Sequence, residues 1–188
     1  MSIHTCFLDD DDRNKRPPRA RKPADRRCAF LPSDMRHFPH VSPGARRANS
    51  KFIGAAGEYF VDSLLMRHGI PVWTAPDMHP ADRLIEVEGQ AIRLQIKTIS
   101  APVNGVCAFL MQHGNARVGK GIRAYRHDAF DIAALVVLSH NAVKFVPNTA
   151  RSFRLFEAEL PDLVIDPLDS LEFCVSAHFQ RGCCCCRC

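Results

Sequence analysis

The hydrophobic positions of the chain become periodic only after about residue 49. Apolar side chains recur every three or four residues from Phe52 to Leu64, which predicts an amphipathic helix. Ser50 is placed to cap the start of this helix. Gly69 is placed to end it, because glycine adopts the left-handed conformation that commonly closes a helix. Residues 70–73 then predict a short strand.

Two further strands are predicted over residues 82–88 and 91–98, joined by a turn at Gly89. The second segment alternates strictly between apolar and polar side chains, which therefore point to opposite faces of a sheet. The apolar face holds Ile92, Leu94 and Ile96, and the polar face holds Arg93, Gln95 and Lys97. Residues 132–138 form a continuous apolar run, which is typical of a central strand buried on both faces.

Other segments complete the expected order of elements. Residues 106–112 and 143–146 predict strands, and residues 113–121 predict an exposed loop because they include three glycines. Residues 150–160 predict a helix that Pro161 ends.

Composition and charge divide the chain of 188 residues into a domain and two tails. Residues 1–50 hold 11 Lys and Arg against 6 Asp, which accounts for the whole net charge of +5. Residues 1–48 are therefore expected to be a disordered basic Pro/Arg-rich tail, residues 49–180 a single domain, and residues 181–188 an unstructured Cys-rich tail. The basic tail has two interpretations: an arm that follows nucleic-acid phosphates, or a solvated segment without a role.

Cysteine usage and hydropathy favour a cytoplasmic protein. Five of the nine cysteines fall within the last six residues, whereas a secreted disulfide scaffold would space them through its core. The Cys-rich tail either binds a soft metal or has no role. No membrane partner is expected, because the longest apolar run has seven residues and a spanning helix needs about 20. The first residues also lack the pattern of a signal peptide.

The hairpin around Gly89 predicts a cluster of functional side chains. With a two-residue turn at Gly89 and Gln90, Asp82 lies opposite Lys97 and Leu84 lies opposite Gln95. A carboxylate, an amide and an ammonium then gather at one end of the polar face, whereas a three-residue turn would separate them. Oxygen ligands of this kind suit Mg²⁺, and a lysine stabilises developing negative charge. The alternative is a surface ion pair across two strands.

Five short motifs, in this order, resemble the PD-(D/E)xK nuclease superfamily. They are Gly54-Ala55-Ala56-Gly57-Glu58, Leu64-Leu65, Gly69-Ile70-Pro71-Val72, Ala81-Asp82-Arg83-Leu84-Ile85 and Leu94-Gln95-Ile96-Lys97-Thr98. The branch that they resemble includes group I intron homing endonucleases and archaeal Holliday-junction resolvases, and Tyr125 followed by Asp128 and Asp131 is similar to that branch too. The resemblance covers about residues 50–147 and neither tail.

The resemblance implies an α/β fold with a central mixed β-sheet flanked by helices, a restriction-endonuclease-like core. It implies that Asp82 binds Mg²⁺ or Mn²⁺, that Gln95 takes the (D/E) position, and that Lys97 is the motif lysine. Glu58 would reach the metal from the first helix, and the carbonyl of Ile96 would complete the ligands.

The sequence departs from the superfamily pattern at two places. Ala81 separates Pro80 from Asp82, while the neighbouring Pro76-Asp77 pair matches the letters of the motif by chance. Gln95 brings an amide oxygen, which still ligates a cation but carries no charge.

A glycine-rich segment supplies candidate DNA contacts. Four cations and a tyrosine lie within ten residues: Arg117, Lys120, Arg123, Tyr125 and Arg126. They would grip phosphates or belong to an ordinary solvated loop.

Three functions are weighed: a metal-dependent DNA endonuclease, a non-catalytic nucleic-acid-binding module on the same fold, and an interaction protein that works through its tails. Whether the chain forms a homo-oligomer stays open.

Overall fold

The computed structural model describes residues 33–114 and 121–182, and all of these except Ser33 fall in one compact unit, 34–188. A 3₁₀ turn, η1 (Ser33–Met35), and a short helix, α1 (Pro43–Ala48), come first. The Ser42 hydroxyl caps α1 by accepting the Ala45 N–H at 3.1 Å, and Ala45 is buried. Order therefore begins before residue 49, which corrects the disorder expected throughout residues 1–48. Residues 1–32 and the Cys-rich tail from Cys183 onward lie outside the described residues.

The predicted first helix is α2 (Ser50–Arg67). Its start differs in detail, because Asn49 is the cap residue and Ser50 already belongs to the helix. Gly69 follows the helix with φ of 77°, the left-handed conformation expected there. The buried face of α2 includes Gly57, where an added Cβ would collide with the Thr98 side chain of the central sheet.

Five strands form the central sheet in the order β1-β2-β3-β7-β8. Only β3 and β7 run parallel, and the other neighbouring pairs are antiparallel, so the expected mixed sheet is confirmed. Their bounds are β1 (Val72–Thr74), β2 (Arg83–Val87), β3 (Gln90–Ile99), β7 (Ile132–Val137) and β8 (Ala142–Pro147). Every residue of β7 is buried, as predicted for the central strand.

The β2–β3 hairpin has a different register from the predicted one. Its turn residues are Glu88 and Gly89, with φ of 52° and 73°, so that Val87 pairs with Gln90. Two positive φ values in a two-residue turn suit the twist of antiparallel strands. This register brings Asp82 to Gln95 rather than to Lys97. Because the shift is two residues along the strand, each side chain keeps its predicted face.

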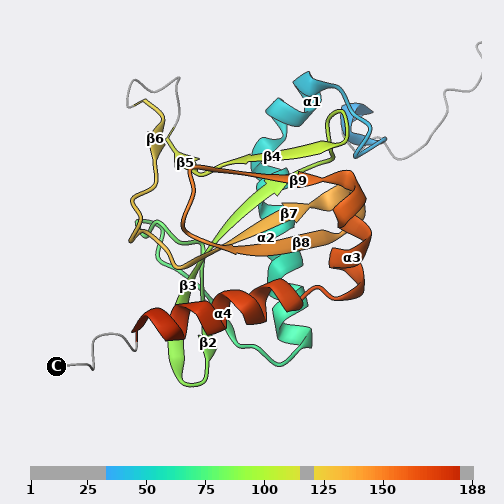
Figure 1. Cartoon of the computed structure of the whole chain (residues 1–188). Helices are drawn as coiled ribbons and strands as arrows, with labels where there is room; N and C mark the ends of the chain where they lie inside the picture. Colours follow the sequence, from blue (N-terminus) through green and yellow to red (C-terminus); the bar gives the residue numbers. More distant parts are fainter. Residues whose placement is uncertain (1–32, 115–120, 183–188) are drawn as a thin grey trace, which may run out of the picture. The chain divides into compact units, whose positions relative to one another are not determined.

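Helices and a second, smaller sheet lie around the central sheet (Figure 1), and an apolar cluster covers each of its faces. On one face, α2 and α4 (Asp169–Gly182) pack against the alternate side chains that include Ile92, Leu94 and Ile96. The other face is covered by a two-stranded sheet, β4 (Val106–Leu110) with β9 (Ser152–Phe156), and by α3 (Leu160–Ile165). The remaining elements are β5 (Gln112–His113), β6 (Arg123–Ala124), η3 (Leu138–His140) and η4 (Glu157–Glu159).

The helix expected over residues 150–160 is wrong. Residues 152–156 form β9, in which Phe153 and Leu155 turn inward and their neighbours are exposed, a period of two rather than 3.6. Pro161 stands at the beginning of α3 instead of ending a helix, as its fixed φ allows in a first turn. The pattern analysis did not anticipate α4.

Candidate active site

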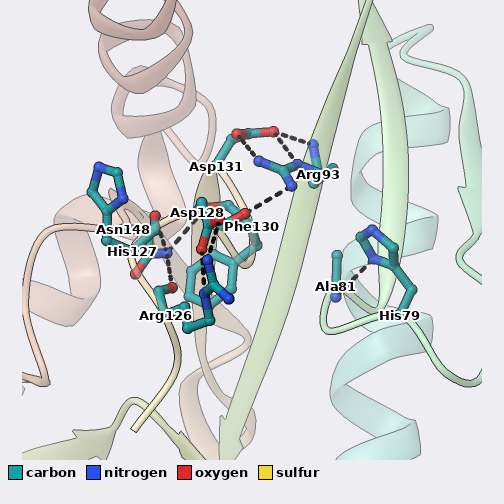
Figure 2. Close-up of polar contacts among 9 residues, drawn as sticks. All are labelled: His79, Ala81, Arg93, Arg126, His127, Asp128, Phe130, Asp131 and Asn148. Carbon is teal, nitrogen blue, oxygen red and sulfur yellow. Dashed lines mark hydrogen bonds and ion pairs between the residues drawn. The ribbon is translucent and has the colours of Figure 1, made fainter.

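Asp82 is held at the start of β2 by backbone contacts on both sides. Its N–H donates to the Leu94 carbonyl at 2.9 Å, and its own carbonyl accepts the Ala75 N–H at 3.1 Å. In the preceding loop, Nδ1 of His79 accepts the Ala81 N–H at 3.0 Å (Figure 2). The carboxylate therefore projects from a fixed position of the backbone.

The Asp82 carboxylate meets strand β3 through one oxygen. Oδ2 accepts the backbone N–H of Ile96 at 2.7 Å and an N–H of the Gln95 amide at 2.6 Å. Burial raises the pKa of Asp82 above its usual value, the hydrogen bond from Ile96 opposes this, and the charge of Glu58 adds to it. The charges of Lys97 and Arg83 lower the pKa but do not cancel the rise caused by burial.

Gln95 is the most enclosed residue of the site, with 4% of its surface exposed. Its Nε2 donates to Asp82 and, at 3.3 Å, to the carbonyl of Ile96. Its Oε1 is buried and has no hydrogen-bond partner among the described residues. Leaving such an oxygen unpaired costs about 1–3 kcal/mol, so an electropositive partner would be favourable there.

Glu58 reaches the site from α2 through Arg83. The Arg83 guanidinium, buried under α2, lies 3.1 Å from Glu58 Oε2 and donates to both oxygens of Asp62 at 2.8 and 3.0 Å. It also donates to the carbonyl of Asp82 at 2.9 Å. The side chain of Glu58 is 35% exposed and that of Asp62 is 18% exposed, so Glu58 is the more accessible of the two acids.

Lys97 extends from the same face of β3 as Gln95 toward Tyr125. Its ammonium donates to the Gln112 carbonyl at 3.1 Å and to the Tyr125 hydroxyl at 3.2 Å, and lies 4.9 Å from the centre of the Tyr125 ring. Burial lowers the pKa of Lys97, and the charge of Asp82 partly offsets this. Burial, followed by the charge of Asp82, raises the pKa of Tyr125 to about 12.

A pocket of about 450 Å³ opens beside Tyr125. Its walls come from the segment around His127 and from residues 148–151, which end in the exposed Arg151. The Tyr125 ring itself is packed by His113 at 5.0 Å and by Phe130 at 5.2 Å between ring centres. Tyr125 thus contacts Lys97 and also lines this pocket.

The five candidate DNA contacts have different surroundings. Tyr125 lies against Lys97, as described. Arg123 is exposed on β6. Arg126 is also exposed but forms an ion pair with Asp128 at 3.1 Å. Arg117 and Lys120 lie outside the described residues.

A second polar cluster, here called the Arg93 cluster, stands two residues before Gln95 on β3 and consists of Arg93, Asp128, Asp131 and Asn148. Arg93 donates to both carboxylate oxygens of Asp131, at 2.8 and 3.1 Å, and to the Asp128 carbonyl at 2.8 Å. The Asn148 amide donates to three carbonyls of the segment 126–130 at 2.9–3.2 Å. Figure 2 shows how these bonds tie the segment before β7 to the sheet.

Asp62, Arg83 and Asn148 were not among the candidate residues predicted from the sequence. Asp62 follows Glu58 by four residues, which places both acids on one face of α2. That spacing, and the presence of Arg83 next to Asp82, were the available signals. Nothing in the local sequence connects Asn148 with the segment that it binds.

The site residues fit a hard divalent cation by their chemistry. Asp82, the amide oxygen of Gln95 and the carbonyl of Ile96 are all oxygen ligands, which Mg²⁺ prefers. The unpaired buried Oε1 supports this fit. Because Nε2 is the amide atom that faces Asp82 and the Ile96 carbonyl, Gln95 would turn its amide over to bind a cation together with them. In the part of the chain that the structure describes, no group of three or more His, Cys, Asp or Glu is placed to hold a metal.

The fold and the arrangement of this site define an α/β protein with a mixed five-stranded sheet that carries an acid, an amide and a lysine on neighbouring strands. Among solved structures, it is similar to a bacterial homing endonuclease, I-Ssp6803I, with a TM-score of 0.50 and 19% sequence identity. The match covers 57% of this chain and 78% of that one. No family model and no curated protein matches the sequence. The likeness confirms the expected fold class.

Two further observations concern membrane-spanning helices and the cysteines. In the described part of the chain, no helix is both long and apolar enough to cross a membrane. The two described cysteines outside the tails, Cys107 and Cys174, are both buried.

Proposed function

We propose that the protein is a metal-dependent endonuclease of the PD-(D/E)xK type that hydrolyses phosphodiester bonds of DNA. The observation that carries this proposal is the buried, unpaired Oε1 of Gln95 beside a carboxylate of raised pKa. A folded protein keeps such an arrangement at a cost in stability, which is typical of functional sites. The homing-endonuclease fold supports the same conclusion by analogy.

Asp82, Gln95, the Ile96 carbonyl and Glu58 would hold Mg²⁺ or Mn²⁺. A cation bound there would neutralise charge on the phosphoryl group and lower the pKa of a coordinated water. Asp82 is fixed for this task by its backbone contacts, and Gln95 by its position on β3.

Lys97 would orient the attacking water and stabilise negative charge that develops on the phosphate. Its ammonium is held by Tyr125 and by the carbonyl of Gln112, so it is positioned before substrate binds. Tyr125 would stay protonated at neutral pH, because its pKa is about 12. DNA leaving the site would pass over Tyr125, with Arg123 and Arg151 available to phosphates.

The proposal is tested by incubating plasmid and branched DNA with the protein in Mg²⁺, in Mn²⁺ or in chelator. Cleavage is expected with either metal and not with chelator. Asp82→Ala should abolish it, and Asp131→Asn, which alters the Arg93 cluster instead, should retain it. Gln95→Glu should cleave at least as well as wild type. If neither wild type nor Gln95→Glu cuts DNA, the nuclease assignment is wrong.

A second candidate function is a non-catalytic nucleic-acid-binding module. The neutral Gln95, in a site with few charged ligands, favours it. This function predicts DNA binding that is independent of metal and unchanged by Asp82→Ala, with no cleavage. A cytoplasmic location and assembly into a homo-oligomer remain predictions for either function.

A further inference from the structure

Arg83 connects helix α2 with the proposed site on β2. It contacts Glu58 and Asp62 on α2 and the backbone carbonyl of Asp82 on β2. Its side chain is 7% exposed. A buried guanidinium with this set of partners fixes the position of two acidic residues that come from different elements.

The two carboxylates of α2 bind Arg83 unequally. Asp62 forms a two-oxygen pair at 2.8 and 3.0 Å, whereas Glu58 makes one contact at 3.1 Å and is about twice as exposed. Asp62 therefore neutralises the guanidinium by itself. Glu58 is held in place but remains available to another cation.

The charges of the surrounding groups also indicate that Glu58 is available to another cation. Three carboxylates (Glu58, Asp62 and Asp82) face two cations (Arg83 and Lys97), so the group carries one excess negative charge. The charge of Glu58 raises the pKa of Asp82. Arg83 keeps these two acids near each other despite that repulsion.

We propose that Arg83 is the positioning residue of the metal site: its guanidinium, held by Asp62, places Glu58 beside Asp82 and leaves Glu58 free to bind a divalent cation. This inference rests on the proposed metal site. It assigns Asp62 a part as well, because without Asp62 the guanidinium would take Glu58 as its main partner.

Arg83→Lys separates position from charge. Lysine keeps the positive charge but cannot bind Asp62 through two parallel hydrogen bonds while also reaching Glu58 and the Asp82 carbonyl. If Arg83 acted only through its charge, Mn²⁺ binding would be unchanged. If it positions Glu58, Mn²⁺ binding should weaken about 10-fold, the scale found when residues that orient metal ligands are changed.

The measurement is a titration with Mn²⁺ alone, followed by the EPR signal of the free ion and repeated with Asp82→Ala to identify the site. Asp131→Asn is the control, because it disturbs the other two-oxygen pair between an arginine and a carboxylate but does not touch the site. We expect Arg83→Lys and Asp131→Asn both to lower the melting temperature. Only Arg83→Lys should weaken Mn²⁺ binding.

A double-variant cycle provides a second test if Arg83→Lys does not fold. Asp62→Asn frees Arg83 to hold Glu58, so Asp62→Asn and Glu58→Gln should each weaken Mn²⁺ binding, and the pair should weaken it little more than either alone. Simple charge effects would add instead.

Three results would overturn the inference. Mn²⁺ affinity of Arg83→Lys within twofold of wild type would show that Arg83 is only a structural ion pair. Additive effects in the double-variant cycle would mean the same. Wild type that shows no Mn²⁺ binding sensitive to Asp82→Ala would remove the metal site itself and, with it, the proposed function.

Discussion

The polar face of β3 carries two clusters that differ in how completely their groups are paired. In the Arg93 cluster, Arg93 binds both oxygens of Asp131, and the Asn148 amide donates to three carbonyls. Two residues along the same strand, the Oε1 of Gln95 has no hydrogen-bond partner within the described residues. The polar groups of the first cluster find their partners within the protein, whereas the Oε1 of Gln95 would gain a partner only from a ligand. This difference separates a cluster that stabilises the fold from the one that we propose to perform chemistry.

The largest effect is expected from Asp82→Ala on cleavage. Loss of a metal-binding carboxylate should reduce the rate by at least about 10³-fold, because a bound cation contributes several kcal/mol to stabilising the transition state. Thermal stability should be unchanged or higher, since a buried carboxylate of raised pKa is removed. Rates on plasmid DNA and melting curves in chelator measure the two effects. A large loss of stability would place Asp82 with the structural cluster.

Asp131→Ala should give the opposite result, with a large loss of stability. Asp131 is 14% exposed and Arg93 is 36% exposed, so we expect a decrease of about 2 kcal/mol in the free energy of unfolding. Burial raises the pKa of Asp131, but the bonds from Arg93 outweigh it, and the net pKa is lowered. The stabilisation is therefore complete above about pH 4 and is lost as the pH falls through the lower folded value. Urea unfolding from pH 2 to 7 measures this loss, which should disappear in Asp131→Ala.

Gln95→Glu tests the difference between the two clusters, because it adds a negative charge beside Asp82. Two adjacent carboxylates repel each other, so the melting temperature in chelator should fall. Mg²⁺ should restore it and raise it more than in wild type, because a ligand that binds only the folded state stabilises that state. Melting curves over a Mg²⁺ series measure the difference. An equal response of both proteins to Mg²⁺ would show that residue 95 does not contact the ion.

The smallest expected effect is in the ionisation of Tyr125. Tyr59 and Tyr125 are the chain's two tyrosines, so Tyr59→Phe isolates Tyr125 in an absorbance titration. Its pKa should be about 12, against about 10 for a free tyrosine. The folded state keeps this proton longer than the unfolded state, so Tyr125 lowers stability as the pH rises from about 10 to 12. Asp82→Asn should move the pKa downward, because the charge of Asp82 contributes to the shift.

Much of the sheet was predictable because its pattern is local. The alternation along β3 fixes the face of every side chain, and the apolar run of β7 indicates a strand buried on both faces. A hairpin error of two residues therefore moved Asp82 from Lys97 to Gln95 without removing it from the cluster. β9 was misassigned because five residues with two inward side chains fit a helical turn and a strand equally well.

The site was predictable only as far as the motif residues. Arg83 could not be assigned from sequence, because its three partners lie 1, 21 and 25 positions away and come together only when α2 packs on the sheet. The role of Tyr125 next to Lys97 depends in the same way on the segment between β5 and β7. Contacts over such distances along the chain are a product of topology and leave no spacing signal.

Gly57 limits which substitutions α2 tolerates, because a larger residue there would displace the adjacent Glu58. Any side chain at residue 57 would have to push α2 away from Thr98, one position beyond Lys97. Glu58 on α2 would then move away from Asp82 and Lys97 on the sheet, although none of the three had been altered. In a library that varies every residue of α2, position 57 should therefore be among the least tolerant. Substitutions there should reduce metal binding and cleavage, as the loss of a metal ligand would, and not only the stability of the helix.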